Sequence, residues 1–600
     1  MYQQNYDPLG NTALSTLVAA VPILVLLYFI ALHPHRDASG TARRGIAAPY
    51  AAFYAVIAAF AVSCLVFHMP FASASSAFGF GVLSGFLGII WIVVAAMFLY
   101  TMTVITGRFE IVKESIVSIS FDRRIQCVLI AFSFGAIIEG TSGFGTRVAI
   151  AGAVMVGLGF RPFQSAVLNL LANTAPVAWG AIGTPIVTLA SVSGLDEVTL
   201  SRMAGRQLPF VSLLVPFWLV ATFVKMEGGT WKQVFEVWPA ALVAGISFAI
   251  VQYLASGTNS FHLMTDVVAG VFSVVCTALF LRFVWQPKTR FLLRSEREAQ
   301  GTAGNASVAR EDRKYSYSTA ETLHAWLPWL ILVLCCALWG MPEFKKFLNN
   351  LFSGATFSTT LLGSPFKGTL SLPAWEMPAL HNLVQRMPPV AAVAAKPEAA
   401  RFTLNWLSAA GTGVFVAAVL SGLALGLNGS KWREAASQTI KRLKMPVLVI
   451  ALVLGLGYMT RYAGTDAVLG LAFTSAGAAY PFFAAYLGWL GVFLTGSDTA
   501  SNALFGGLQR ITAEQLHLNP VLTVATNSTG GVMGKMIDAQ SIMVACAACY
   551  EDPAERTHAL GPIFRTVFWH SIAGAAVIGL IALLQAYVFP DAIASTIVGQ

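Results

Sequence analysis

The sequence predicts an all-α, polytopic membrane protein made of two inverted halves. The chain has 600 residues, of which 56% are hydrophobic and only 11% are charged, whereas soluble domains carry roughly 25% charged residues. Apolar runs that are long enough to cross a bilayer recur along the whole chain. Two of these regions, one in each half, are interrupted by small polar and charged residues, and paired interruptions are typical of transporters with inverted repeats.

The N-terminal half, residues 1–285, begins with a polar stretch that lacks the basic segment of a cleavable signal, so the first apolar run is expected to remain as a span. Basic and apolar residues mix at 107–124, which predicts an amphipathic helix at the membrane interface. Residues 126–160 have a Gly-rich centre and predict a re-entrant hairpin, and residues 162–193 predict a broken helix. Ordinary spans are predicted at 13–32, 46–67, 80–106, 207–224, 234–255 and 264–285.

A basic cytoplasmic linker is predicted at 286–321, where Lys and Arg alternate with Ser, Gly and Glu. The C-terminal half, residues 322–600, contains a long polar, Pro-rich segment at 341–401 that has few cations and is expected to be an external loop. Its other predicted elements repeat the order of the first half: spans at 323–339, 402–427 and 445–461, a basic segment at 428–444, a short apolar piece at 466–479, a hairpin at 481–516, a broken helix at 519–549 and a last span at 563–589.

The distribution of Lys and Arg predicts the orientation of the chain. Placing the basic loops inside follows the positive-inside rule and gives about 12 crossings plus two hairpins, with both termini outside. The first hairpin then enters from the cytoplasm and the second from outside, which is the antiparallel relation of an inverted repeat. These loops also account for the net charge of +9, so the charge does not indicate nucleic-acid binding.

The first interrupted stretch, residues 132–187, contains groups that a bilayer should reject. Glu139 and Arg147 lie on either side of a Gly-rich turn, and Asn173 and Thr174 interrupt the apolar run that follows. A charge at bilayer depth costs roughly 2.5–3.5 kcal/mol, so such residues normally face protein or a water-filled cavity. The stretch is therefore interpreted as half of a transport site.

The second interrupted stretch, residues 488–548, repeats this pattern. The segment TGSDT at 495–499 corresponds to EGTSG at 139–143, and NSTGG at 527–531 corresponds to NTAP at 173–176. The two breaks lie 34 residues apart in the first half and 32 in the second. A pair of Gly-rich helix-packing faces would also bring small residues together, but such packing needs no charged side chains.

The breaks are rich in groups that bind small anions. Helix ends that face a cavity present unpaired amides and the positive end of a dipole. Arg147 can hold a carboxylate through two hydrogen bonds, although an ion pair with Glu139 explains it equally well. The sequence therefore favours a small anion with hydroxyl and carboxylate groups. The expected substrate-binding residues are Thr141, Ser142, Gly143, Arg147, Asn173, Thr174, Ser497, Thr499, Asn502, Asn527, Ser528, Thr529 and Lys535.

Three carboxyl groups, those of Glu139, Asp498 and Asp538, are the candidates for carrying a coupling proton. An apolar cavity disfavours an ionised carboxylate and a nearby cation favours it, and a proton carrier needs these two effects to be balanced. A helix cap or a salt bridge is the competing interpretation of Glu139. Asp538 is three residues from Lys535 and is placed to pair with it.

No cofactor and no metal site are predicted. The seven cysteines all fall in apolar segments and are expected to be buried thiols. Cys546 and Cys549 are three residues apart, but no further ligand completes a metal site. The nine histidines lie at span ends or in loops. A membrane-embedded enzyme is not expected, because the spans lack a nucleophile with a base or a metal.

Seven motifs extend over nearly the whole chain: QQNYDP, FGAIIEGTSGFGTRVAIAGAVMVGLGFRP, NTAPVAWGAIGTPI, GRQLPF, RMPPV, GWLGVFLTGSDTASNALFGGLQ and NSTGGVMGKMIDAQSI. Together they resemble the bacterial L-lactate permease family. The resemblance implies a multi-pass protein of the inner membrane that takes up L-lactate, and usually also D-lactate and glycolate, together with a proton. It also implies a relation to the ion-transporter superfamily, whose members often move a transport domain as an elevator within a homodimer.

The resemblance also extends to individual positions. The matching residues are Glu139, Gly140, Gly143, Phe144, Gly145, Asn173, Thr174, Pro176, Ser497, Asp498, Asn502, Asn527, Thr529 and Lys535. The family typically has Pro at the position of Arg147, Ala-Ala or similar residues at 141–142, and a Ser-like residue at the position of Asp538. Arg147 therefore adds a cation and Asp538 adds an anion relative to the family pattern. Both charges bear on substrate preference and coupling, and they are expected to compensate each other.

Sodium coupling is the second hypothesis for the mechanism. The paired Asn-Thr and Asn-Ser breaks at 173–174 and 527–528 are what sodium sites of the superfamily look like, because backbone carbonyls and hydroxyls suit a hard cation. The expected partners are a small monocarboxylate, a proton or sodium ion, the lipid bilayer and a second copy of the chain.

Overall fold

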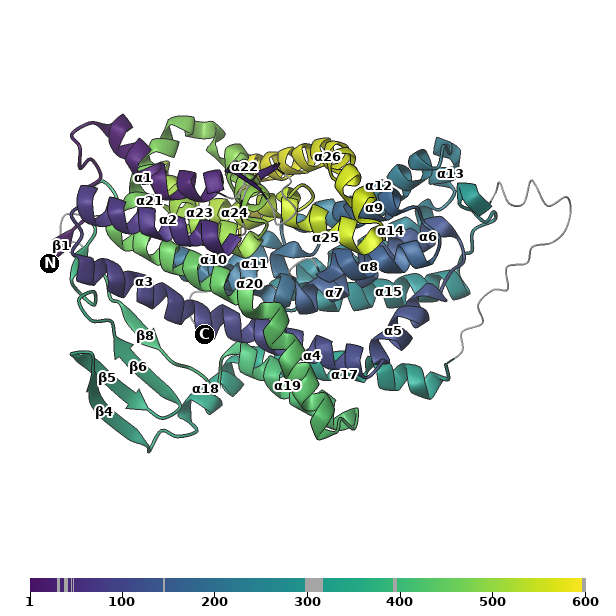
Figure 1. Ribbon diagram of the computed structural model, residues 1–600, viewed down its shortest axis with the longest axis horizontal. Helices are drawn as coiled ribbons and strands as arrows, with labels where there is room; N and C mark the ends of the chain where they lie inside the picture. The colour runs from purple at the N-terminus through teal and green to yellow at the C-terminus, as the bar shows by residue number, and fades with distance from the viewer. Residues whose placement is uncertain are drawn as a thin grey trace, which may run out of the picture.

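Long apolar helices make up most of the computed structural model, which describes residues 1–29, 33–36, 42–44, 46, 48–143, 146–296, 317–391 and 396–595. The helices form an elongated bundle, and a small sheet projects from the end at which the N-terminus lies (Figure 1). The predicted linker at 286–321 lies largely outside the described residues, since only its two ends belong to them.

The N-terminal half forms a series of apolar helices with short breaks. Its main elements are α1 (Thr12–Leu27), α2 (Ala48–Ala61), α3 (Phe71–Gly85), α4 (Trp91–Ile105), α5 (Arg108–Val117), α6 (Arg123–Cys127), η4 (Val128–Phe134), α7 (Gly135–Ser142), α8 (Thr146–Gly157), α9 (Pro162–Ala172), α10 (Gly180–Ser193), α11 (Glu197–Ala204), α12 (Leu208–Met226), α13 (Trp231–Phe235), α14 (Trp238–Ser256) and α15 (Thr265–Phe283). Between α1 and α2, two short strands pair with each other, β2 (Pro34–Arg36) and β3 (Ala42–Arg44).

The C-terminal half is also built mainly from helices with short breaks. Its helices are α17 (Thr319–Gly340), α18 (Pro342–Asn350), α19 (Ala410–Ala424), α20 (Gly429–Ala463), α21 (Thr465–Phe473), α22 (Tyr480–Thr495), α23 (Asp498–Gln515), α24 (Pro520–Gly534), α25 (Ala539–Cys549) and α26 (Pro553–Tyr587). The predicted basic segment and the span after it, at 428–461, form one continuous helix, α20, which lies beside α3 (Figure 1).

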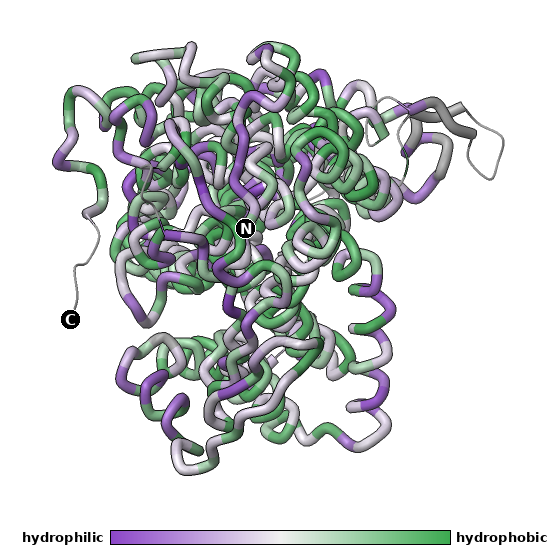
Figure 2. Tube along the Cα trace, turned by 90° about the vertical axis from the view of Figure 1, so that its left-hand side faces the viewer, coloured by the Kyte–Doolittle hydropathy of each residue, from purple (hydrophilic) through white to green (hydrophobic). Residues whose placement is uncertain are grey.

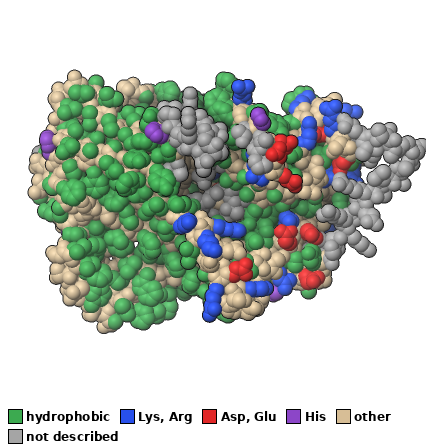
Figure 3. Space-filling view, in the orientation of Figure 1, with side chains coloured by type: hydrophobic (Ala, Val, Ile, Leu, Met, Phe, Trp, Pro, Cys, Tyr) green, Lys and Arg blue, Asp and Glu red, His purple; other side chains and the backbone are tan. Residues whose placement is uncertain are grey.

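The helical surface has the character of a multi-pass membrane protein. Leucines in the middle of outer helices are widely exposed, as at Leu214 and Leu334, and an exposed apolar surface of this extent requires lipid or a partner. On the face shown in Figure 3, hydrophobic side chains cover the left and middle, whereas Lys, Arg, Asp and Glu gather towards the right. An end-on view shows hydrophobic segments in outer and inner helices alike (Figure 2).

Ten helices within the described residues are long and apolar enough to cross a membrane, or eleven if the bent pair Pro162–Ala172 and Val177–Ser193 counts as one span. The sequence predicted about 12 crossings. The two sets differ in membership: Arg123–Thr141 and Thr465–Phe493 fall in the predicted hairpin regions, the predicted broken helices are not among the ten, and two predicted spans contain only shorter apolar helices. In the predicted first span the described helix covers only Thr12–Leu27, and in the predicted span at 402–427 the chain first forms a strand, so that its helix α19 has only 15 residues.

The predicted external loop at 341–401 is an ordered subdomain. It contains α18 and four strands in the order β4-β5-β6-β8: β4 (Thr356–Leu361), β5 (Ser364–Thr369), β6 (Leu372–Glu376) and β8 (Arg401–Thr403). Every neighbouring pair is antiparallel. The β-branched and aromatic residues of β4 and β5 explain the strands, whereas the polar, Pro-rich composition alone suggested only a loop.

The N-terminal peptide is fixed against this subdomain and the bundle. Strand β1 (Tyr2–Gln3) pairs in parallel with β7 (Val384–Gln385). The buried Tyr2 hydroxyl donates to the backbone carbonyls of Phe67 and Ala463. The peptide therefore joins the external subdomain to the break between α20 and α21.

The core of the bundle is built from the interrupted helices, and their packing is reciprocal. Helix α10, from the broken helix of the first half, packs against α23 of the second hairpin, and α25, from the broken helix of the second half, packs against α8 of the first hairpin. Small residues make both contacts close: a Cβ on Gly506 would lie 2.7 Å from Val192, and one on Gly152 would lie 3.0 Å from the Cys549 sulfur. The two interrupted regions therefore form one unit.

Candidate functional site

Two helical arms meet at the first break. Helix α7 ends at Gly143, whose φ of 57° lies in the left-handed region that favours glycine. From the start of α8, the Arg147 guanidinium reaches back between the arms and donates to the Ala131 carbonyl and to Asn173 Oδ1, the latter at 3.3 Å. A Cβ on Gly135 would lie 2.5 Å from Arg147 Nε, so a glycine is required there.

Arg147 keeps unused hydrogen-bonding capacity although it is fully buried. Its Nε has no hydrogen-bond partner, and neither has the Nδ2 of the adjacent Asn173. Unsatisfied donors in the interior are costly, and they are common where a ligand completes the bonding. Arg147 Nε and Asn173 Nδ2 are therefore two buried donors without an acceptor at the first break.

Glu139 lies one turn before the end of α7, with a side chain that is 3% exposed. Its Oε2 accepts no hydrogen bond. The carboxyl group of Glu139 lies against the first residue of α10, since a Cβ on Gly180 would be 3.2 Å from Glu139 Oε1. Glu139 and Arg147 form no ion pair within 4.0 Å, so the alternative interpretation of Arg147 as the direct partner of Glu139 does not describe this conformation.

The break beside Glu139 has an unusual backbone. Ala181 and Ile182 have φ values of 46° and 55°, and Gly183 has 70°, so three successive residues are left-handed inside α10. Residues with side chains rarely adopt this conformation, and such strain is concentrated at functional sites. Gly143 packs directly on it, because a Cβ there would lie 2.9 Å from the Ala181 Cβ. The first hairpin thus ends against an unwound segment of α10.

At the second hairpin, α22 and α23 are joined at Gly496 and Ser497. Asp498 begins α23 and is 3% exposed. Its Oδ2 accepts hydrogen bonds from Ser528 Oγ at 2.6 Å and from Asn502 Nδ2 at 3.3 Å. Its Oδ1 has no partner and lies against Gly531, where a Cβ would be only 2.3 Å away. One oxygen of the carboxylate is therefore satisfied and the other is enclosed without a donor.

Asn502 connects the two halves of the chain. Its Nδ2 also donates to the Pro185 carbonyl of α10 at 3.1 Å, and its Oδ1 accepts from Asn527 Nδ2 at 2.9 Å. Asn527 in turn accepts from Gln509 Nε2. The second broken helix is thus held to the second hairpin and, through Asn502, to the first broken helix.

Lys535 and Asp538 lie in the break between α24 and α25. Lys535 Nζ donates to the Gly496 carbonyl and lies 3.4 Å from Asp538 Oδ2. Asp538 Oδ1 accepts from the Ser541 amide and so caps α25. Asp538 thus pairs with Lys535, as the sequence suggested, whereas no ion pair joins it to Arg147.

Charged groups of both breaks act on one another electrostatically. Lys535 acts on both Glu139 and Asp498, and Arg147 acts on Glu139 and on Asp266, a residue of α15. Together with Asp538, these residues form a set that we call the charge cluster: Glu139, Arg147, Asp266, Asp498, Lys535 and Asp538. All six side chains are at least nine-tenths buried.

Several of the expected substrate-binding hydroxyls are used within the protein. Thr141 donates to a carbonyl of its own helix, Thr174 donates from the turn after α9 to the Leu171 carbonyl, and Thr529 donates to Gln207. Ser497 Oγ caps α23 by accepting from the Ala500 amide. Thr499 is buried at the start of α23. Ser142 is the last residue of α7 and its side chain is outside the described part of the chain, as are Phe144 and Gly145.

Sequence reasoning missed three buried polar residues at this site. Asp266 was assigned to an ordinary span, although an acidic residue at the start of an apolar run is a visible signal. Gln207 and Gln509 belong to two of the family motifs, GRQLPF and GWLGVFLTGSDTASNALFGGLQ, but no role was assigned to either residue. Gln207 bonds to Thr526, Thr529 and Gln585, and Gln509 bonds to Asn527.

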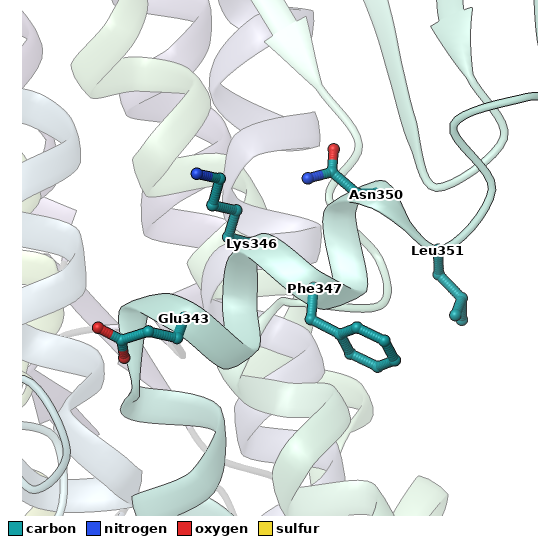
Figure 4. A pocket seen from close by; sticks show the side chains of 5 residues that line it. All are labelled: Glu343, Lys346, Phe347, Asn350 and Leu351. Atoms are coloured by element: carbon teal, nitrogen blue, oxygen red, sulfur yellow. The ribbon is translucent and has the colours of Figure 1, made fainter.

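A separate hollow occurs on the surface of α18. It is lined by Glu343, Lys346, Phe347, Asn350 and Leu351, whose side chains point in different directions from one short helix (Figure 4). None of these residues contacts the charge cluster. Among the described residues, no group of three or more His, Cys, Asp or Glu side chains is placed to hold a metal ion.

A polytopic helical bundle with buried charges at two interrupted helices defines a membrane transport protein. The chain belongs to the L-lactate permease family, whose model matches residues 15–589. It is 42% identical over 596 residues to the glycolate permease GlcA of Escherichia coli (strain K12), covering 99% of this chain and 100% of the relative. It is 40% identical over 588 residues to an L-lactate permease of the same strain, covering 98% of each chain. An L-lactate permease of Bacillus subtilis (strain 168) is 39% identical over 591 residues, covering 98% and 99% of the two chains.

Proposed function

We propose that the protein imports L-lactate, and also D-lactate and glycolate, across the bacterial inner membrane by proton symport. Relatives named for lactate and for glycolate are about equally similar to it over nearly their whole length. Both substrates are small 2-hydroxy monocarboxylates, so a site that accepts either needs a cation for the carboxylate and a polar group for the hydroxyl.

The charge cluster carries this proposal. It contains four carboxyls and two cations, so full ionisation would leave two uncompensated negative charges in the protein interior. Buried charges without partners are strongly unfavourable, and protonation of a carboxyl removes the cost. Glu139, Asp498 and Asp538 are the proposed proton carriers.

The free donors of Arg147 and Asn173 are the proposed substrate contacts. A carboxylate at Arg147 Nε would accept the hydrogen bond that the group lacks, and Asn173 Nδ2 could donate to the hydroxyl or to the second oxygen. The remaining predicted residues, from Thr141 to Lys535, would then shape and polarise the pocket. The proposal is supported by the contact between the broken helices of the two halves, since Asn502 bonds both to Pro185 of α10 and to Asn527 of α24.

Sodium coupling is a second candidate, and one observation favours it. Asp498 Oδ1 has no donor, and the Asn502 side chain that bonds to the same carboxylate also bonds to the Pro185 carbonyl and to Asn527; oxygen ligands suit a hard cation. Inverted repeats, a location of both termini outside and an elevator motion within a homodimer are further parts of the proposal; the reciprocal packing of the interrupted helices supports the first of these.

The test is uptake of radiolabelled L-lactate into proteoliposomes under an imposed inward proton gradient with sodium absent. Accumulation above equilibrium that a protonophore abolishes would establish proton symport. Accumulation only after sodium is added would select the second candidate. No uptake of L-lactate under either condition, with uptake of glycolate or a larger carboxylate, would overturn the substrate assignment.

A further inference from the structure

We propose that Asp266 is a second coupling residue, which shares the transported proton with Glu139; this inference rests on the proposed proton symport. Asp266 lies in the first turn of α15 and its side chain is 0% exposed. Neither of its carboxylate oxygens accepts a hydrogen bond. A buried carboxylate with no donor is unfavourable, whereas a protonated carboxyl in the same position avoids most of that penalty.

Two donors lie close to Asp266, the Gln252 side chain and the Trp179 backbone amide, and both favour its ionised form. Each of them also bonds to a backbone carbonyl: Gln252 Nε2 donates to that of Ala175 at 3.0 Å, and the Trp179 amide donates to that of Pro176. Asp266 does not cap its helix, because α15 begins after Met264 without a side-chain cap. The Asp266 carboxylate is therefore only weakly satisfied by donors that it shares with backbone carbonyls.

Asp266 and Glu139 lie on two sides of the same unwound peptide. A Cβ on Gly140, the residue after Glu139, would lie 3.3 Å from the Asp266 Cβ, so α15 and α7 approach each other closely at this level. Trp179 lies next to Asp266, and Gly180 lies next to Glu139. The two carboxyls thus face the beginning of the strained segment of α10.

The charges around Asp266 set its protonation. Glu139 faces it from α7 and Arg147 from α8, and these are the two charged groups that act on it. Arg147 acts on both carboxyls and Lys535 acts on Glu139, so both carboxyls can remain ionised while the site is empty. Like-charged carboxylates that lose a shared cation usually share a single proton. We therefore expect the Glu139–Asp266 pair to bind one proton when a substrate anion occupies Arg147.

This arrangement gives a direct reason for coupling. When a lactate anion occupies the donors of Arg147, the guanidinium compensates the substrate, and the Glu139–Asp266 pair loses its cation. The pair then binds a proton from the outside, one carboxylate becoming a carboxylic acid. When lactate leaves on the inside, Arg147 again compensates the pair and the proton is released to the cytoplasm. One proton would thus move with each lactate bound at Arg147.

The test compares Asp266→Asn with Thr277→Val in proteoliposomes. Thr277 is a buried residue on the same face of α15 whose hydroxyl has no partner, so its variant controls for changes in packing. Two assays are needed: accumulation of L-lactate under a proton gradient, and exchange of labelled for unlabelled L-lactate at equal pH, which requires binding and movement but no net proton transfer.

For Asp266→Asn we expect accumulation to fall by about tenfold or more while exchange stays within about twofold of wild type and loses its pH dependence. Asp266→Glu should restore accumulation, and Thr277→Val should resemble wild type in both assays. Wild-type accumulation by Asp266→Asn would overturn the inference, as would an equal loss of both activities in a variant with an unchanged melting temperature. If the wild-type protein itself shows no proton-driven accumulation, the proposed function fails first and the inference falls with it.

Discussion

The Ser528 hydroxyl donates a hydrogen bond of 2.6 Å to Asp498 Oδ2. This bond joins the second broken helix, α24, to the first residue of α23 in the second hairpin. Only the other oxygen, Oδ1, is left without a donor, and it is enclosed against Gly531. Asp498, a proposed proton carrier, is therefore held at one oxygen by a hydrogen bond, and its other oxygen occupies space that exists because Gly531 has no side chain.

Gly531→Ala is expected to displace Asp498. The added methyl would lie 2.3 Å from Asp498 Oδ1 and 2.9 Å from Val492, so the carboxylate must move, and overpacking of this kind costs about 1–3 kcal/mol. We expect a lower melting temperature and loss of lactate accumulation. The matched control is Gly79→Ala in α3, where nothing lies within 4 Å, and where Ala should stabilise the helix by roughly 0.5–1 kcal/mol. Equal behaviour of the two variants would contradict the close fit.

Arg147→Lys tests the proposed substrate contact. The guanidinium bonds to Ala131 and Asn173 and keeps Nε free, and a lysine cannot reproduce this planar set of donors. We expect KM for L-lactate to rise by about tenfold or more. Arg510→Lys is the control, because Arg510 also donates to a backbone carbonyl, that of Ser193, but is partly exposed. A fall in melting temperature with unchanged KM would show that Arg147 only braces the hairpin.

Lys535 and Asp538 are expected to behave as a coupled pair. Removing one partner of a buried ion pair leaves an uncompensated charge and costs about 3–5 kcal/mol. Lys535→Met alone should therefore destabilise the protein strongly, whereas Lys535→Met with Asp538→Asn should recover most of the loss, since Asn can still cap α25. Thermal unfolding in detergent measures both variants. Exchanging the charges of Arg147 and Asp538 should give no such recovery, because no ion pair joins them.

Most of the architecture could be predicted from the sequence because hydrophobic length is a strong signal. The interrupted helices were found from Gly, Pro and charged residues inside apolar runs. The ordered external subdomain was missed, because its strands β4 and β5 are short and lie within a polar, Pro-rich stretch. The length of α20 was also missed, because the cations of its first half, Lys431, Arg433, Lys441, Arg442 and Lys444, were interpreted as a separate cytoplasmic segment.

The candidate site was predicted less completely than the fold. Charged residues inside apolar runs, such as Glu139 and Asp498, are visible in one dimension, and the structure buries both. Which donors remain free is a tertiary property: Thr529 looked available, but Gln207 from α12 takes its hydroxyl. The role of Asp266 depends on the approach of α15 to α7 at Gly140, and no local sequence pattern specifies that approach.

Glu227, which follows α12 outside the spans, should make stability depend on pH. Burial alone would raise the pKa of its carboxyl, but hydrogen bonds from Gln164 and the Arg294 amide and the charge of Arg161, 3.0 Å away, lower it below its ordinary value. A lowered pKa contributes stability above the ordinary value of about 4.3, and this is lost as the pH falls through the lowered pKa. Glu227→Gln should therefore have a lower melting temperature than wild type at pH 7, with a difference that shrinks at pH values below about 4. A pH-independent difference would show that Glu227 acts through packing rather than charge. Glu434→Gln is the control, since that exposed carboxyl accepts a hydrogen bond from Gln438 of the same helix.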